Sequence, residues 1–282
     1  MWATQPVKFG LFHIIVIIIA LIAVAFGIYF GHRLRGEAYE KKRDLILTIF
    51  GFSLLALEAF KVIFTICVGA ADLTLISFQI CSTPMYFLPF VFFLKRKWLK
   101  EVVYSYPIFV GFASAMAYLV NPAAMIKTPY IIMSIHSALF HIALIFVGAF
   151  GMVGYELTNK RGIIAFSKAY VIFVILSLIA MTTDFIVRHY IPDTKMNLFY
   201  LYPDGNTFPI IDAYVRPYVP YPVYFLVFLA MYYATVMIFS SIVFFSDFLI
   251  KKFQNKKVEE QPLCIRHVYT ETDDYEWMVI HS

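Results

Sequence analysis

Hydrophobic residues in this chain gather in long runs that are separated by short polar connections. A membrane-spanning helix needs about 20 mostly apolar residues, and seven runs meet that requirement. They cover residues 9–31, 44–67, 73–94, 104–120, 129–152, 163–187 and 222–249. The pattern predicts an all-α, polytopic membrane protein that folds as a seven-transmembrane helix bundle.

The composition supports a membrane protein over a soluble one. Of the 282 residues, 61% are hydrophobic and only 15% are charged, whereas soluble domains are about 45–50% apolar and about 25% charged. The net charge of +5 comes from basic residues in the short connections. No basic stripe or reader motif accompanies this charge, so we expect membrane lipids as partners and no nucleic acid.

Lysine and arginine are distributed unequally over the two sets of connections, which predicts the orientation. The connections after the first, third and fifth runs are basic, and so is the start of the C-terminal tail. The opposite connections carry few basic residues. We therefore predict an external N-terminus, a membrane domain over residues 1–252 and a cytoplasmic tail over residues 253–282. The residues that carry this asymmetry are Arg33, Arg35, Lys41, Lys42, Arg43, Lys95, Arg96, Lys97, Lys100, Lys160, Arg161, Lys251, Lys252, Lys256 and Lys257.

The longest connection, residues 188–221, falls on the external side of this topology. It is rich in tyrosine and phenylalanine, which suit a loop folded back on the membrane interface. A disordered linker would carry fewer aromatic residues. We expect an ordered lid.

The third run carries the most informative pattern, LTLISFQICSTPMYFLPFVFFLK, from Leu73 to Lys95. A polar patch and two prolines interrupt it. Such a patch costs free energy inside a membrane unless it faces other helices or a wet cavity. We expect this segment to form the wall of a site, with the polar residues Gln79, Cys81, Ser82 and Thr83 ahead of Pro84 and Pro89.

Ionisable residues of the other runs are predicted to lie at the same depth as this patch, in the outer half of the membrane. Glu58 and Lys61 are three residues apart, so mutual neutralisation is an alternative to a functional role. Asp184 lies near a helix end, where a salt bridge is also possible. His136 and His141 are about 140° apart around a helix, which disfavours a two-histidine metal site. We predict no metal and no cofactor.

Cys81 and His136 together suggest nucleophilic chemistry. A thiol becomes a useful nucleophile when an adjacent base or positive group favours the thiolate. The alternative is that Cys81 is a small buried hydrophobic residue, as most free cysteines are. Cys67, Cys81 and Cys264 form no disulfide framework and no CxxC pair.

The segment FQICSTPMYFLPFVF resembles the LPLHLC…LLP segment of the YwaF-like bacterial integral membrane proteins. HSALFHIALIFVGAFG, MNLFYLYP and YPVYFLVF resemble three further segments of that family in the same order, so the similarity extends from about Glu58 to Phe245. The resemblance implies a bacterial plasma membrane. Animal relatives of the family include a transmembrane acyltransferase that moves fatty acyl groups into ether phospholipids through a cysteine and a histidine.

By this resemblance His136 matches the catalytic histidine and Cys81 matches the cysteine of the bacterial motif. The animal motif has a Cys-His pair at the positions of Phe78 and Gln79, so Gln79 replaces the usual histidine. The resemblance therefore implies a cysteine/histidine acyltransferase in which Cys81 lies three residues beyond the animal cysteine.

Our leading hypothesis is a lipid acyltransferase whose polar cavity opens to the outer leaflet. A transporter, or a protein that binds small molecules or lipids in the same cavity, is the main alternative, although no internal repeat supports a transporter. A seven-helix receptor is less favoured, because Lys95-Arg96-Lys97 stands where a DRY triplet would follow the third run. The candidate site residues are Cys81 and His136 for catalysis, and Gln79, Glu58, Lys61, His141, Asp184, Asn197 and Tyr200 for binding.

Overall fold

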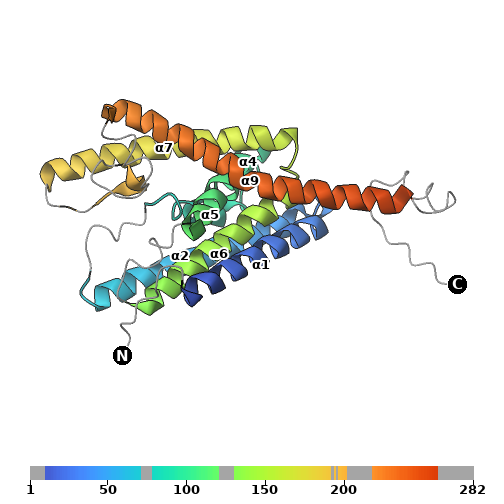
Figure 1. Cartoon of the computed structure of the whole chain (residues 1–282), viewed down its shortest axis with the longest axis horizontal. Helices are drawn as coiled ribbons and strands as arrows, with labels where there is room; N and C mark the ends of the chain where they lie inside the picture. The colour runs from blue at the N-terminus through green and yellow to red at the C-terminus, as the bar shows by residue number, and fades with distance from the viewer. Residues whose placement is uncertain are drawn as a thin grey trace. The chain divides into compact units, whose positions relative to one another are not determined.

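A computed structural model describes residues 10–70, 78–120, 130–191, 194, 196–201 and 218–259, with no side-chain detail at Tyr200 or at 255–259. Every regular element in these ranges is helical (Figure 1). The long helices are α1 (Leu11–Arg33), α2 (Glu40–Cys67), α4 (Lys97–Tyr106), α5 (Phe112–Val120), α6 (Ile131–Gly154), α7 (Lys160–Tyr190) and α9 (Tyr221–Glu259). The short elements are η1 (Glu37–Tyr39), α3 (Pro84–Phe87), η3 (Leu88–Phe90), the π-turn η4 (Pro107–Gly111) and η6 (Leu198–Tyr200).

Within the described residues, six helical stretches are long and apolar enough to cross a membrane. Helices α4 and α5 form one of them, because the π-turn η4 joins them without a break. This confirms an all-helical membrane protein that crosses the bilayer several times. The stretches are Leu11–Arg33, Glu37–Cys67, Lys97–Val120, Ile131–Gly154, Lys160–Tyr190 and Tyr221–Gln254.

The third apolar run differs from the prediction, because its described part is not one continuous helix. Residues 78–94 form short turns with α3 and η3, which are only four and three residues long, in their middle. Pro84 and Pro89 each begin or nearly begin one of these elements, and a proline removes a backbone donor and clashes with the preceding helical turn. The two prolines are the physical reason for the broken helix.

Helix α2 provides hydrogen-bond partners and close packing for this irregular segment. The Thr48 hydroxyl donates to the Leu88 carbonyl at 3.4 Å and accepts from the Phe92 N–H at 3.1 Å. Gly51 lies against the same turn, where an added Cβ would come within 2.6 Å of the Pro89 nitrogen. Irregular backbone is tolerated at membrane depth only where protein groups satisfy and cover it. The segment therefore depends on α2 for its conformation.

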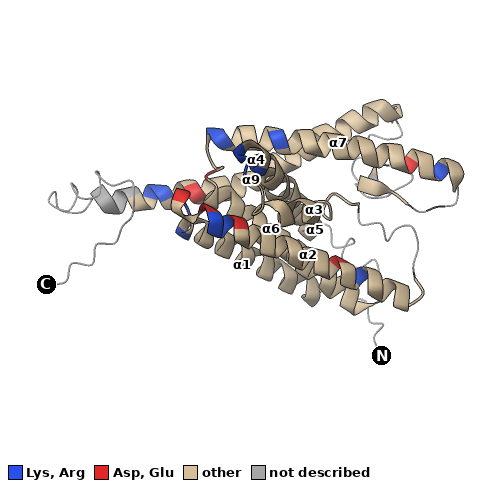
Figure 2. Cartoon of the chain, turned by 180° about the vertical axis from the view of Figure 1, so that it is seen from behind, with Lys and Arg blue, Asp and Glu red and all other residues tan. Residues whose placement is uncertain are grey.

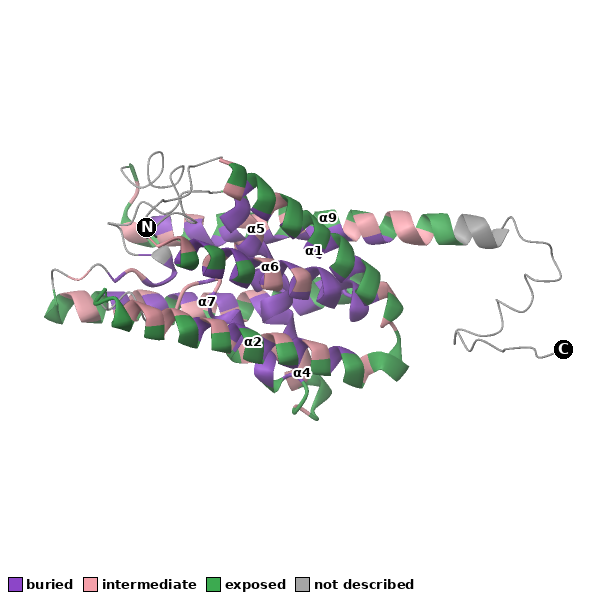
Figure 3. Ribbon diagram, turned by 90° about the horizontal axis from the view of Figure 1, so that it is seen from below, coloured by how far each residue is buried: buried purple, intermediate pink, exposed green. Residues whose placement is uncertain are grey.

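Helix α6 lies at the centre of the described bundle, and most of its residues are buried (Figure 3). Helix α1 approaches it closely through two glycines. An added Cβ would lie 2.9 Å from the Ala149 Cβ at Gly27 and 2.8 Å from the Val153 Cβ at Gly31. Small residues that let backbones approach in this way are typical of helix packing in membranes. From the first contact to the second, both helices move four residues towards their C-terminal ends. Helices α1 and α6 therefore run parallel.

Helix α2 packs against α6 in the opposite direction. Phe50 stacks on Phe146 with ring centroids 4.9 Å apart, whereas Phe64 contacts Tyr130 at 5.4 Å. A later residue of α2 thus meets an earlier residue of α6. Helices α7 and α9 are also antiparallel, because the later residue Phe185 of α7 contacts the earlier residue Tyr221 of α9.

A charged network joins α2, α4 and the residue after α6 at one end of the bundle. The Asp44 carboxylate accepts from Lys100 Nζ and from the Tyr155 hydroxyl, both at 2.6 Å, and Lys100 also pairs with Glu40 at 2.8 Å. Arg43 lies over the Tyr155 ring. Figure 2 shows charged residues gathered around these elements and long uncharged stretches along the helices beyond them.

Candidate functional site

Cys81 lies in the irregular segment just before α3, and it is partly buried. The neighbouring Ser82 side chain forms a hydrogen bond with the thiol. Two charged residues of α2, Lys61 and Glu58, interact electrostatically with Cys81. The proline-interrupted backbone thus brings the thiol to the charged part of α2.

Glu58 and Lys61 form an ion pair on one face of α2. Glu58 is buried, with 6% of its surface exposed, whereas a quarter of the Lys61 side chain is exposed. A buried carboxylate is tolerated when it is paired, so the mutual neutralisation that the spacing suggested is confirmed. The charges of the pair also act electrostatically on both candidate catalytic residues.

His136 projects from α6 towards α2. Its Nε2 lies 2.9 Å from the Leu57 carbonyl oxygen. A carbonyl only accepts hydrogen bonds, so Nε2 carries a proton, and in the neutral imidazole Nδ1 then carries the lone pair. Glu58 and Lys61 also interact electrostatically with this histidine. In this tautomer His136 is a base.

Cys81 and His136 are therefore both within electrostatic range of the same ion pair, although they are far apart in the sequence. Within the residues that the structure describes, the thiol and the imidazole share no direct hydrogen bond. Catalytic hydrogen bonds are often long before substrate binds and shorten only in the complex. The arrangement positions a thiol, a base and a paired ammonium group in one layer of the bundle.

His141 faces a different neighbour, as the five-residue spacing predicted. Its Nδ1 lies 2.6 Å from the Ser137 carbonyl, and its ring stacks on Tyr118 of α5 with centroids 3.6 Å apart. His136 also interacts electrostatically with His141. His141 thus belongs to the α5 side of the same polar layer.

Residues 196–201, which we term the strap, lie against α7 and the Cys81 segment. Asp184 of α7 accepts from the Leu198 N–H with both carboxylate oxygens, at 2.8 and 3.0 Å. Arg188 donates to the Met196 carbonyl at 2.9 Å, and the Gln79 side-chain amide donates to the Asn197 carbonyl at 3.2 Å. Asp184 holds this part of the fold in place. The side chain of Tyr200 lies outside the described residues.

Phe199 anchors the strap in the bundle. It is fully buried, and it stacks on Phe78 at 5.4 Å and on Phe173 of α7 at 6.1 Å. Its φ of 52° lies in the left-handed region, which is unfavourable for a bulky side chain. The aromatic contacts and the hydrogen bonds to Asp184 and Arg188 offset this local strain.

Sequence reasoning missed three tyrosines that are within electrostatic range of Cys81. Tyr106, Tyr118 and Tyr232 all interact electrostatically with the thiol. The Tyr106 hydroxyl hydrogen-bonds to Thr83 at 2.7 Å, and the Tyr232 hydroxyl donates to the Val110 carbonyl of the π-turn at 3.0 Å. A tyrosine inside an apolar run is typical of an ordinary hydrophobic core. In the sequence only Pro107, which begins the π-turn, indicated that this part of the chain is irregular.

The described residues contain no group of three or more histidine, cysteine, aspartate or glutamate side chains that could hold a metal ion. The site consists of a thiol, an imidazole, an ion pair and several hydroxyl groups. These groups suit proton transfer and nucleophilic attack on a carbonyl.

Comparison with known proteins gives one match. No curated protein and no solved structure matches the chain significantly. A family model described as TMEM164 family matches residues 8–240. That range contains every residue of the candidate site, from Glu58 to Tyr232. The chain therefore belongs to the TMEM164 family of membrane proteins.

Proposed function

We propose that this protein is a cysteine/histidine phospholipid acyltransferase, with Cys81 as the nucleophile and His136 as the general base. The observation that carries the proposal is that one ion pair, Glu58–Lys61, acts electrostatically on both Cys81 and His136. The resemblance of the Cys81 segment to the YwaF-like proteins, and of His136 to the catalytic histidine of their animal relatives, points to the same chemistry.

In the first half of the reaction, Cys81 loses its proton to Nδ1 of His136. The thiolate then attacks the ester carbonyl of a phospholipid, and a bond forms between sulfur and the acyl carbon. The ester C–O bond breaks, and the leaving alkoxide takes the proton back from His136. The products are an acyl thioester on Cys81 and a lysophospholipid, so atoms and charge balance.

In the second half, a hydroxyl group of an acceptor lysophospholipid attacks the thioester. His136 removes the hydroxyl proton as the new ester bond forms, and it returns that proton to the departing Cys81 thiolate. The enzyme is regenerated, and one acyl chain has moved from one lipid to another without a cofactor.

The ion pair has an electrostatic role in this scheme. The Lys61 ammonium group acts electrostatically on Cys81 and stabilises the thiolate, because a positive charge in range favours the ionised thiol. Glu58 neutralises Lys61 in the resting protein, which reduces the cost of keeping an ammonium group at membrane depth. The hydrogen bond from Nε2 to Leu57 holds His136 in the tautomer that the scheme requires.

Residues 78–94 form a seventh, irregular passage through the membrane in this proposal. Helices α1 and α6 run parallel, so the chain crosses an odd number of times between them, and α2 with α4–α5 supplies only two crossings. The segment also runs antiparallel to α2, because Phe92 contacts Thr48 while the earlier residue Leu88 packs on the later residue Gly51. These observations support seven passages, one of them broken by Pro84 and Pro89.

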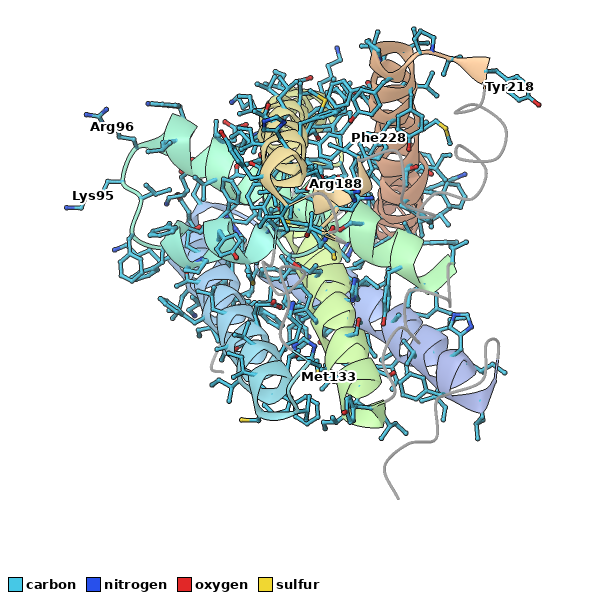
Figure 4. The ribbon with its side chains drawn as sticks, turned by 90° about the vertical axis from the view of Figure 1, so that its left-hand side faces the viewer. Lys95, Arg96, Met133, Arg188, Tyr218 and Phe228 are labelled. Atoms are coloured by element: carbon cyan, nitrogen blue, oxygen red, sulfur yellow. The ribbon has the colours of Figure 1, made fainter. Side chains whose placement is uncertain are left out.

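The basic connections support an external N-terminus and a cytoplasmic C-terminus. Lys95 and Arg96 follow the irregular passage and point away from the helices (Figure 4). The Asp44–Lys100 network lies at the same end. This orientation puts the site in the outer half of the membrane and the tail over residues 253–282 in the cytoplasm. Most of the predicted lid over residues 188–221, and the tail beyond residue 259, lie outside the described residues. A bacterial plasma membrane stays a prediction.

The proposal is tested by trapping the thioester in membranes that contain a phospholipid with an alkyne-tagged acyl chain. We expect tagged protein in the wild type and in Cys67→Ala, which removes an exposed cysteine. Cys81→Ala should abolish the tag, and His136→Ala should slow its appearance. Absence of the tag from all four proteins, with the lipid profile unchanged, would overturn the proposal in favour of binding or transport.

A further inference from the structure

Helices α1 and α5 enclose an apolar groove of about 380 Å³. This volume falls within the range of small-molecule pockets, roughly 300–1,000 Å³. Only one polar side chain, that of His13, lines the groove. The lining residues are His13, Ile14, Ile17, Ala20, Leu21, Val24, Met116, Leu119 and Val120.

The groove is continuous with the membrane-facing surface of the bundle. Leu21 and Ile14 line it, yet they remain 60% and 50% exposed. Both helices belong to stretches that are apolar enough to span a membrane. Hydrocarbon is the medium at this surface, and an unfilled groove would forfeit the dispersion contacts of its lining atoms. Water is disfavoured, because an ordered water needs two to four polar partners.

The shape of the groove suits an elongated apolar ligand. From His13 to Val24 the groove follows α1 for about 16 Å at 1.5 Å per residue. His13 marks its end near the start of α1, where Nε2 hydrogen-bonds to the Leu119 carbonyl at 2.8 Å. The other lining side chains are aliphatic or thioether groups. The wall of the groove is therefore almost entirely hydrocarbon, and His13 lies at one end of it.

We propose that this groove binds one acyl chain of a phospholipid from the leaflet in which α1 begins. The aliphatic length receives the chain, and the His13 end lies towards the ester and head group of the lipid. A phospholipid is the occupant that the environment supplies and whose acyl chain matches the apolar wall and the length of the groove.

The helix register places the mouth of the groove at the level of the candidate site. Gly27 packs beside Ala149 and Gly31 beside Val153, and the same offset places His13 within one residue of the level of His136. A lipid in the groove would then carry its ester groups at the depth of the thiol and the imidazole. The role of the groove as a substrate pocket rests on the proposed function. Its occupation by lipid does not require that the protein be an enzyme.

The test uses the full-length protein in nanodiscs that contain a phosphatidylcholine with a diazirine in one acyl chain. After illumination, the crosslinked peptides are mapped by mass spectrometry. We expect crosslinks concentrated on residues 13–24 and 116–120. Met116→Trp and Ile17→Trp place a bulky ring in the groove, and each should reduce these crosslinks at least several-fold. Ile18→Trp, on the exposed face of the same helix turn, should leave them unchanged.

Two comparisons separate the groove from the catalytic proposal. Cys81→Ala should retain the groove crosslinks, so their presence without any thioester would support the groove and reject the enzyme. Crosslinks spread evenly over lipid-facing positions such as Ile18, and unaffected by both groove variants, would overturn the inference.

Discussion

Replacing Asp184 by alanine should release the strap from α7. The buried carboxylate accepts the Leu198 N–H with both oxygens, at 2.8 and 3.0 Å. An alanine side chain offers no acceptor in its place. Hydrogen bonds to charged groups contribute about 1.5–3 kcal/mol. Loss of this interaction should increase the population of the released strap by roughly 10- to 150-fold, because each 1.4 kcal/mol is a factor of ten.

Hydrogen exchange measures this change directly, because amide protection reports the free energy of local opening. In detergent or nanodiscs, the Leu198 amide of Asp184→Ala should exchange about 10- to 150-fold faster than in the wild type. Asp184→Asn retains one acceptor oxygen without the charge, so its exchange should be intermediate. Thr182→Ala, an exposed substitution on the same turn, is the control. If the Leu198 amide exchanges at the wild-type rate in both Asp184 variants, the conclusion that Asp184 holds the strap is refuted.

Three further predictions concern other parts of the molecule. Gly27→Ala should lower the stability by about 1–3 kcal/mol through overpacking against Ala149, measured by thermal unfolding in detergent; an unchanged midpoint would contradict the close packing of α1 on α6. Tyr155→Phe should remove the 2.6 Å hydrogen bond to Asp44 and cost about 1.5–3 kcal/mol. Burial, with Asp44 nearby, raises the pKa of Tyr155 well above its ordinary value, so this loss should be constant from about pH 6 to 9 and disappear only above about pH 10. Lys61→Met should slow acylation of Cys81 at least tenfold, because it removes the positive charge beside the thiol, and an unchanged acylation rate would exclude that role.

Several features of the fold followed directly from the order of residues. Long apolar runs predicted the helices, because a bilayer accepts few other structures. The five-residue separation of His136 and His141 predicted different neighbours, and the structure places one against α2 and the other against Tyr118. The spacing of Glu58 and Lys61 likewise indicated their ion pair.

Other features depend on partners that are remote in the sequence. The prolines of the third apolar run signalled an interruption, but its conformation depends on Thr48 and Gly51 of α2. The left-handed backbone of Phe199 depends on ring contacts with Phe78 and Phe173. No local pattern encodes such contacts, so the strap and the tyrosines around Cys81 required the structure.

The central claim is that Cys81 carries an acyl chain. Its most direct test is peptide mapping of the protein after incubation with phospholipid of a single known acyl composition. We predict that the peptide containing Cys81 gains the mass of that acyl group, that hydroxylamine removes it, and that added lysophospholipid discharges it into a new phospholipid. An unmodified Cys81 peptide in the wild type, at every time point and with intact donor lipid, would contradict the account.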